Sequence, residues 1–235
     1  MFTREHHQRI ALALESMNVD LLWEHNCYFG GGTAIALRHG EYRESVDIDF
    51  LVSDLASYRT LREMVTGNGL TELWSTSPSA LLIPRQGIRA DQYGIRCTLE
   101  VMGTRIKFEI VLEGRIQFEK PPATDAICGV PALTDKDLAA SKLLANSDRW
   151  ADDGVFSRDL IDLAMMDLPL KILRSAVFKA EQAYGDAILR DLGKAIDHMR
   201  ERDGWLDRCI QAMAMTAPRA AVWSKVRRLK RLCNA

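Results

Sequence analysis

The sequence predicts an α/β (α+β) protein in which a mixed region of strands and helices, residues 1–130, precedes a helical region, residues 131–235. Period-two alternation of apolar and polar residues, typical of strands, occurs in the first region. The second region carries helical spacing and few strand formers. Between them the stretch KPPATDAICGVP is interrupted by prolines and a glycine, which indicates a boundary loop.

The elements of the first region follow from local periodicity. Ile10, Ala13, Leu14 and Met17 recur at helical spacing and predict an opening amphipathic helix. A strand ending near Phe29, a helix over 33–39 and a strand over 46–53 should follow. Segments 95–103 and 104–114, separated by a turn at Gly103, predict an antiparallel hairpin.

The second region predicts a helical bundle. Apolar residues recur at intervals of three and four in five successive segments, with polar residues between them. The segments are 133–146, 155–166, 169–185, 186–200 and 219–232.

Composition excludes several classes of protein. Lys and Arg total 31 against 32 Asp and Glu, so the net charge of -1 gives no global attraction to nucleic acid or an anionic membrane. No apolar run approaches the roughly 20 residues that cross a bilayer, and we expect a cytoplasmic protein without a membrane partner. Five scattered cysteines, odd in number and never spaced as CxxC, predict reduced thiols rather than disulfides or a zinc site.

The segment VDIDF places two carboxylates side by side. Strand geometry puts Asp47 and Asp49 on one face, with Val46, Ile48 and Phe50 facing the core. Two adjacent carboxylates repel each other unless a cation lies between them, and paired hard oxygen ligands suit Mg²⁺. From this motif alone, the solvated face of an amphipathic strand is an equal alternative.

The glycines preceding this strand favour phosphate chemistry. Gly30, Gly31 and Gly32 lie between a predicted strand and a predicted helix, where the lack of Cβ lets backbone N–H groups approach a phosphate. A plain turn is the alternative for a glycine run. The combination of a phosphate cradle with a metal-binding acid pair indicates phosphoryl transfer.

A third carboxylate occurs in TRIKFEIVLEG. Lys107 and Glu109 share one strand face, and we expect Glu109 beside Asp47 on a neighbouring strand, where it would complete a two-metal site. The alternative is a pair of charge partners on an exposed face.

Five short motifs, taken in order, resemble one family. FGGGTAIAL, RESVDIDF, KFE, SKLLA and RDLIDL resemble the AbiEii/AbiGii-type toxins of the DNA polymerase β-like nucleotidyltransferase superfamily, which includes MenT-type toxins. The resemblance covers residues 28–163. It implies a two-lobed protein with an N-terminal mixed-sheet nucleotidyltransferase core and a C-terminal helical lobe.

The resemblance also implies roles for individual residues. The glycine motif that binds the nucleotide triphosphate falls on Gly30, Gly31, Gly32 and Thr33, and the DxD pair that carries Mg²⁺ falls on Asp47 and Asp49. The KxD-type motif falls on Lys107 and Glu109, where glutamate replaces the more usual aspartate. The later motifs fall on Lys142, Arg158, Asp159 and Asp162.

The residues of the later motifs can also be interpreted from their positions on predicted helices. Lys142 lies amid apolar neighbours on a predicted helix, where it either reaches water or binds an anion such as a triphosphate. Asp159 and Asp162 share a helical face, and one of them would receive Lys142 or contact the nucleotide or its acceptor. The alternative is a structural ion pair joining helices, and for Arg158 the two interpretations carry equal weight.

The expected reaction is transfer of a nucleoside monophosphate from an NTP to an acceptor hydroxyl, with Mg²⁺ or Mn²⁺ bound by Asp47, Asp49 and Glu109. Lys142 and Asp159 join the catalytic set, and Ser45, Lys107, Lys142 and Asp162 join the nucleotide-binding set. The resemblance implies the 3′ end of tRNA as acceptor, with translation blocked, and a cognate antitoxin as partner. The alternatives are nucleotidylation of a protein or of a small molecule such as an aminoglycoside, and a non-catalytic nucleotide-binding antitoxin or regulatory module.

Two further features lie outside this core. Ser45 stands two residues before Asp47, so its phosphorylation would place negative charge beside the metal ligands and should inactivate the enzyme. The C-terminal segment 219–232 concentrates Lys and Arg beside an apolar stripe, which predicts either a phosphate-binding surface or, with more weight, an amphipathic terminal helix with a solvated basic face.

Overall fold

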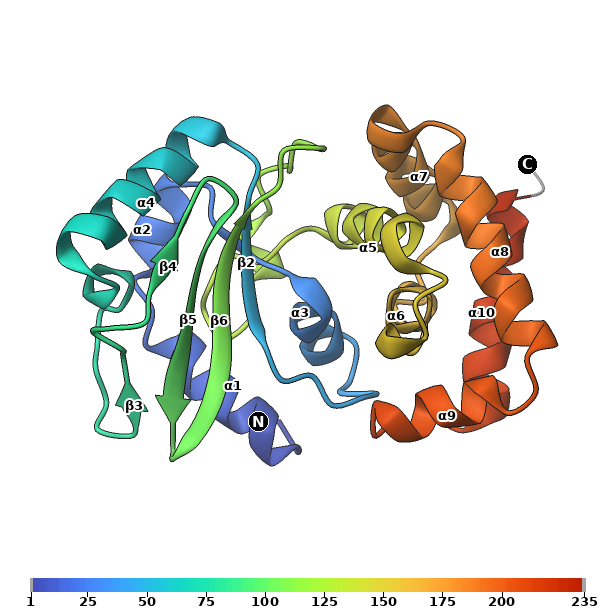
Figure 1. Ribbon diagram of the computed structural model, residues 1–235, viewed down its shortest axis with the longest axis horizontal. Helices are drawn as coiled ribbons and strands as arrows, with labels where there is room; N and C mark the ends of the chain where they lie inside the picture. The colour runs from blue at the N-terminus through green and yellow to red at the C-terminus, as the bar shows by residue number, and fades with distance from the viewer. Residues whose placement is uncertain (1, 234–235) are drawn as a thin grey trace. The chain divides into compact units, whose positions relative to one another are not determined.

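The computed structural model describes residues 2–233, which form two compact units. The first, here called the sheet unit, contains the chain up to Arg38 and then Ser45–Thr134. The second, the helical unit, contains His39–Glu44 and the chain from Asp135 onward. Figure 1 shows the course of the chain through both.

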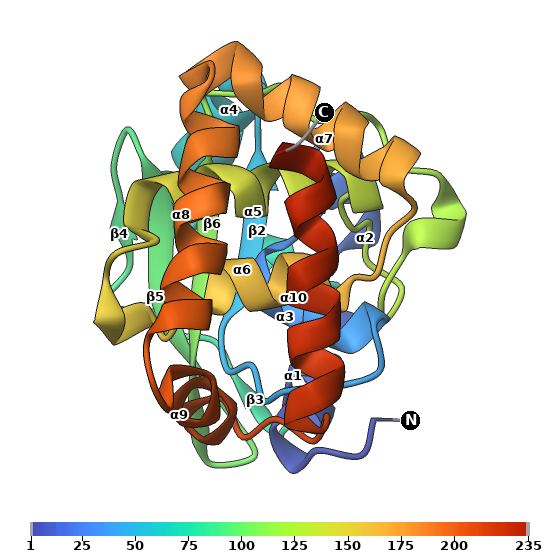
Figure 2. The same cartoon turned by 90° about the vertical axis from the view of Figure 1, so that its right-hand side faces the viewer.

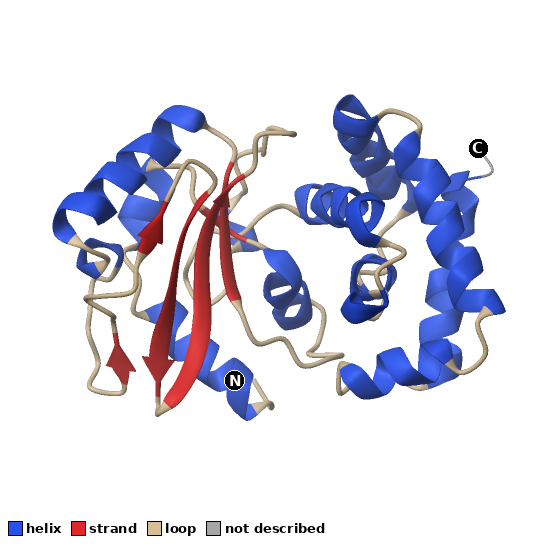
Figure 3. Cartoon of the chain, viewed as in Figure 1, coloured by secondary structure: helices blue, strands red, loops and turns tan. Residues whose placement is uncertain are grey.

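The sheet unit combines a six-stranded sheet with four α-helices (Figures 1 and 3). Its helices are α1 (Glu5–Glu15), α2 (Val19–Glu24), α3 (Gly31–Arg38) and α4 (Leu55–Asn68), with 3₁₀ turns at Thr71–Leu73 and Ala123–Asp125. Its strands are β1 (Tyr28–Phe29), β2 (Ile48–Val52), β3 (Leu81–Leu82), β4 (Arg89–Ala90), β5 (Gly94–Val101) and β6 (Thr104–Leu112).

The sheet is mixed, with the strand order β1-β2-β6-β5-β3 and β4 also paired to β5. Strands β2 and β6 run parallel, and the other pairs are antiparallel. The predicted hairpin is confirmed as β5 and β6, which turn at Met102 and Gly103, both with positive φ. The predicted α/β (α+β) class is confirmed.

Strand alternation gives the sheet two chemically different faces. Phe50 of β2 and Phe108 of β6 are fully buried, with ring centroids 5.9 Å apart, and they lie on the core face. The opposite side, here called the polar face, carries Asp49 of β2, Lys107 and Glu109 of β6, and Arg96 of β5. The residues predicted to carry chemistry on these strands therefore share one face.

Two local expectations for this unit are wrong. Val46 does not face the core but is 47% exposed, because strand β2 begins only at Ile48. Helix α3 begins at Gly31 rather than after the glycines, since the N–H of Ala34 already bonds to the carbonyl of Gly30 at 3.3 Å. Asp47 thus precedes its strand, and two of the three glycines belong to a helical first turn.

The helical unit confirms the predicted bundle. Its helices are α5 (Asp135–Arg149), α6 (Arg158–Met165), α7 (Leu170–Tyr184), α8 (Ala187–Glu201), α9 (Trp205–Ala212) and α10 (Arg219–Cys233), with a 3₁₀ turn at Asp153–Val155. Helices α8 and α10 lie side by side (Figure 2), and α10 buries Val222, Val226, Leu229 and Leu232. No helix within residues 2–233 is long and apolar enough to cross a membrane.

The segment His39–Glu44, which follows α3 in sequence, packs within the helical unit. The N–H of Glu44 donates to the carbonyl of Met213 at 3.0 Å, and the N–H of Thr216 donates to the carbonyl of Tyr42 at 3.0 Å. The composition of the sequence does not predict that this segment belongs to the helical unit.

The five cysteines are free thiols, as expected. Cys27, Cys97 and Cys209 are buried, and burial raises the pKa of Cys97 to about 12. These thiols are therefore protonated packing residues at neutral pH.

Candidate active site

The central feature of the polar face is a pair of carboxylates on neighbouring parallel strands. The register of β2 and β6 places Asp49 directly opposite Glu109. The expectation that Glu109 lies beside Asp47 is therefore wrong, because the ladder pairs it with the second aspartate of the motif. Asp47 immediately precedes β2, and its charge still acts on this cluster, as the pKa of Lys107 indicates.

The side chain of Glu109 lies between two cations. Arg96 Nε donates to Glu109 Oε1 at 3.0 Å, and Lys107 Nζ lies 2.9 Å from Glu109 Oε2. Partial burial lowers the pKa of Lys107, but the hydrogen bond to Glu109 and the charges of Glu109, Asp47 and Asp49 raise it above its ordinary value. Arg96 was missed by the sequence analysis, although it is the only basic residue of β5.

The glycine segment lies directly against Asp49. Gly31 has φ +67°, and a Cβ at this position would lie 3.0 Å from the Cβ of Asp49 and closer still to its Oδ2. Because Gly31 is also the first residue of α3, the Asp49 carboxylate lies at the positive end of this helix. Gly30 has a packing role, since a Cβ there would lie 2.9 Å from a methyl carbon of Leu133.

Thr33 and Ser45 connect α3 to the residue preceding β2. The Thr33 hydroxyl donates to the backbone oxygen of Asp47 at 2.5 Å and lies 2.8 Å from the Ser45 hydroxyl. The backbone N–H of Ser45 in turn donates to Nε2 of the buried His7 at 3.1 Å. Thr33 and Ser45 are both buried, and the Thr33 hydroxyl links Ser45 to the backbone of Asp47.

The helical unit contains a buried network centred on Asp162. This fully buried carboxylate accepts hydrogen bonds from Arg43 Nε at 2.6 Å, Arg43 Nη2 at 2.9 Å and the Tyr42 hydroxyl at 2.6 Å, and Lys142 Nζ lies 2.7 Å from its Oδ2. Burial would raise the pKa of Asp162, but the charges of Arg43 and Lys142 hold it well below its usual range. Arg43 and Tyr42 were not predicted, because their partner is distant in sequence.

Asp159 extends the network towards the surface. Lys142 Nζ lies 3.0 Å from its Oδ1, and Arg149 Nε donates to its Oδ2 at 2.7 Å. Burial opposes ionisation of Asp159, but Lys142 and Arg149 together lower its pKa. The ion pair between α5 and α6 that the sequence left open is therefore present.

A third carboxylate acts on the outer part of this network. Arg43, Lys142 and Arg149 contact Asp159 and Asp162, and the charge of Asp148 also raises the pKa of Arg149. Arg158, the neighbour of Asp159 in sequence, is half-buried and pairs with no side chain among the described residues.

The acids of the sheet unit supply hard oxygen donors. No group of three or more His, Cys, Asp or Glu side chains within residues 2–233 is placed to hold a metal ion. Asp47 and Asp49 fit a divalent cation by their chemistry, whereas both oxygens of Glu109 face cationic side chains.

The basic C-terminal helix is partly neutralised within its own unit. Arg228 Nη1 lies 2.7 Å from Asp167, Lys225 Nζ lies 3.3 Å from the same carboxylate, and Lys230 Nζ lies 3.0 Å from Asp197. This arrangement agrees with the amphipathic terminal helix that the sequence analysis favoured.

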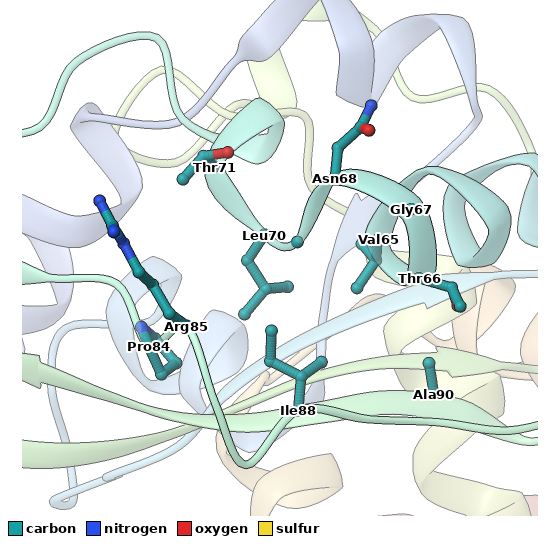
Figure 4. Close-up of a pocket in the computed structure, with 11 residues that line it drawn as sticks. Val65, Thr66, Gly67, Asn68, Leu70, Thr71, Pro84, Arg85, Ile88 and Ala90 are labelled. Carbon is teal, nitrogen blue, oxygen red and sulfur yellow. The ribbon is translucent and has the colours of Figure 1, made fainter.

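A pocket of about 700 Å³ lies elsewhere in the sheet unit, beneath the C-terminal end of α4 (Figure 4). Leu70 and Ile88 point towards one another at its centre, and Arg85 lies at its side. None of the predicted site residues lines it.

Comparison with known proteins finds a family model that matches most of the chain. The family model described as "Nucleotidyl transferase AbiEii toxin, Type IV TA system" matches residues 12–224. No curated protein matches the sequence.

Three solved structures resemble the chain. JHP933 from Helicobacter pylori is 15% identical with a TM-score of 0.54, covering 100% of this chain and 95% of that one. An H. pylori protein provisionally assigned as a nucleotidyltransferase is also 15% identical with a TM-score of 0.54, covering 99% and 98%. MenT4, a nucleotidyltransferase toxin from Mycobacterium tuberculosis, is 16% identical with a TM-score of 0.48, covering 96% and 84%. At these identities the first two show a shared fold.

Proposed function

The chain belongs to the AbiEii family of nucleotidyltransferase toxins, and from this premise we propose that it transfers a nucleoside monophosphate to the 3′ end of tRNA and so blocks translation. The acceptor hydroxyl attacks the α-phosphorus of the NTP, the bond to the β-phosphate oxygen breaks, and pyrophosphate leaves. The type IV toxin-antitoxin assignment of the family implies a cognate antitoxin as partner.

The observation that carries this proposal is the position of Asp49. Its carboxylate lies opposite Glu109 across two parallel strands and against Gly31 at the positive end of α3. A carboxylate beside a helix N-terminus brings cation-binding oxygens next to backbone N–H groups that suit phosphate. Phosphoryl transfer needs both in one place, because the triphosphate must be neutralised and held in a fixed geometry.

A divalent cation fits the acids of this face. We assign Asp47 and Asp49 as its ligands, with Glu109 as a third carboxylate beside Asp49. Oxygen donors of this kind suit Mg²⁺ and Mn²⁺. When bound, such an ion lowers the pKa of an attacking hydroxyl and neutralises phosphate charge.

The protein groups have separate proposed tasks. Gly31, Gly32 and the first turn of α3 receive the triphosphate, and Thr33 with Ser45 holds Asp47 in place. Lys107, 54% exposed in its side chain, supplies a cation beside the acids. In the helical unit, Lys142 Nζ lies 3.0 Å from Asp159 and 2.7 Å from Asp162, and we assign this lysine to a nucleotide phosphate, with the two carboxylates orienting it.

The proposal is tested by incubating the purified protein with Mg²⁺, total tRNA and each α-³²P-labelled NTP in turn. Wild type should label tRNA with at least one NTP, and Asp49→Asn should reduce labelling to background. Glu100→Gln is the matched control, because it also removes one carboxylate from the polar face but lies on β5, away from Asp49. Equal labelling by wild type and Asp49→Asn would refute the assigned site. Label that enters a protein or a small molecule instead of tRNA would refute tRNA as the acceptor but would still support nucleotidyl transfer.

A further inference from the structure

A row of four charged side chains crosses the polar face at one level of the ladder. Arg89 of β4 pairs with Arg96 of β5, Arg96 pairs with Glu109 of β6, and Glu109 pairs with Asp49 of β2. Residues directly opposite one another in neighbouring strands point to the same face. The row covers three inter-strand steps, about 14 Å at the usual strand spacing. It therefore joins the acids at one end to two arginines at the other.

The guanidinium of Arg96 is held in a fixed place. It donates to Glu109 Oε1 at 3.0 Å and lies 3.3 Å from Asp91 Oδ2. A Cβ at Gly94, two residues earlier on the same face, would lie 3.2 Å from Arg96 Nη2, so the absence of a side chain there leaves room for the guanidinium.

Asp91 is itself fixed by the turn between β4 and β5. Its Oδ1 accepts the N–H groups of Tyr93 at 2.8 Å and Gly94 at 3.1 Å. Those backbone hydrogen bonds, together with Arg96 and Arg89, lower its pKa. Backbone and carboxylate groups thus hold the guanidinium of Arg96, whose side chain is 35% exposed, in one place, which is the arrangement expected of a preorganised ligand-binding group.

The pairing of Arg89 with Arg96 is unfavourable by itself. Like charges directly opposite one another on a sheet repel, and both arginines lower the pKa of the Asp91 carboxylate. Arg89 is exposed and makes no hydrogen bond or ion pair with the described residues. An anion that binds over the two guanidinium groups would relieve this repulsion.

We propose that Arg89, Arg96 and Lys107, here called the basic strip, bind successive phosphates of the acceptor strand and lead its 3′ end to the acids. This inference rests on the proposed function and adds to it the surface that holds the nucleic acid. The proposed function assigns the triphosphate to Gly31, which lies against Asp49. Arg89 lies three strands away from Asp49, so it would contact a different ligand. A spacing of cations across several strands fits a repeating phosphodiester chain, and Arg suits phosphate because its planar fork donates two bonds at once.

Arg89→Gln tests the strip without touching Glu109. Binding of fluorescently labelled tRNA is measured by anisotropy over a range of salt concentrations, and NTP affinity is measured on the same protein. Arg59→Gln is the matched control, because Arg59 is also exposed and without a partner in the described sheet unit but lies on helix α4. Arg89→Lys retains the charge and should retain most of the affinity.

We expect Arg89→Gln to weaken tRNA binding on the order of 5-fold relative to Arg59→Gln, because the variant loses one exposed contact with a phosphate. The slope of log affinity against log salt should become shallower by about 0.7 to 1. NTP affinity should stay unchanged.

Three results would overturn the inference. Equal tRNA binding by Arg89→Gln and Arg59→Gln would refute the proposed role of the basic strip. The proposed function would stand if wild type still labels tRNA. A loss of NTP affinity in Arg89→Gln would assign the strip to the triphosphate. Absence of tRNA binding and labelling by wild type would overturn both the strip and the proposed acceptor.

Discussion

Arg43 donates hydrogen bonds to both carboxylate oxygens of Asp162, from Nε to Oδ1 at 2.6 Å and from Nη2 to Oδ2 at 2.9 Å, although the two residues are 119 positions apart in the chain. Both side chains are buried, and Lys142 and Tyr42 share the same carboxylate. This contact fixes the segment His39–Glu44 within the helical unit. A motif residue predicted to contact the nucleotide therefore also has a structural task, and the two tasks can be separated by experiment.

Asp162→Asn should destabilise the protein strongly. The substitution leaves Arg43 and Lys142 buried with less negative charge to balance them, and breaking a buried ion pair in this way costs about 3–5 kcal/mol. Urea unfolding followed by circular dichroism measures the change. Asp207→Asn is the control, since its pair with Arg219 is exposed and should contribute less than about 1 kcal/mol. Similar free energies of unfolding for the two variants would contradict a structural role for Asp162.

Acid should weaken the protein through the same carboxylates. The pKa values of Asp159 and Asp162 are lowered in the folded state, so the unfolded chain binds more protons at low pH. Their contribution is fully present above the ordinary carboxyl pKa of about 4 and is lost progressively as the pH falls below it. The urea midpoint measured from about pH 5 to pH 2 should fall steeply for wild type and less steeply for Asp159→Asn. Parallel curves would show that Asp159 does not contribute.

Lys142→Met should separate catalysis from stability. In this variant Asp162 remains paired with Arg43, and Asp159 remains paired with Arg149. The free energy of unfolding should therefore fall less than in Asp162→Asn. If Lys142 neutralises the triphosphate, turnover should fall on the order of 100-fold or more. Lys179→Met is the matched control, because it removes a lysine from the ion pair with buried Asp137 in the same unit. Equal turnover in the two variants would leave Lys142 with a structural role alone.

Gly31→Ala should displace Asp49. The new Cβ would press on the Asp49 carboxylate, and a misplacement of about 1 Å at a reacting centre can cost on the order of 100-fold in rate. Gly103→Ala is the control, because Gly103 also has positive φ, +74°, but a Cβ there meets nothing within 4 Å. Both variants should lose about 1–2 kcal/mol to left-handed backbone strain. Pyrophosphate release should fall only in Gly31→Ala, and an equal rate in both would argue against the Asp49 site.

Thr33→Val should loosen Asp47. The variant leaves the Ser45 hydroxyl and the Asp47 carbonyl without their buried partner, which costs about 1–3 kcal/mol. Thr33→Ser keeps the hydroxyl and should restore both stability and tRNA labelling. Labelling that is unchanged in Thr33→Val despite a lower melting temperature would show that Thr33 supports the fold but not the position of Asp47.

The sequence was informative where a short-range signal exists. Period-two alternation located the hairpin of β5 and β6, helical spacing located the bundle, and the order of five motifs identified the family, which the match over residues 12–224 confirms. These features could be read because each depends on neighbours a few residues apart. The start of β2 could not, because Val46 continues the apolar alternation although the ladder begins at Ile48.

The sequence by itself determined the class of fold, the family and which acids and glycines to consider. Only the tertiary structure decided which groups meet: Glu109 opposite Asp49 rather than Asp47, Arg96 across from Glu109, and Arg43 on Asp162. The reason is that strand register and buried ion pairs join residues far apart in the chain. Periodicity reports which face a residue occupies within its own element, but it carries no information about the element that packs opposite.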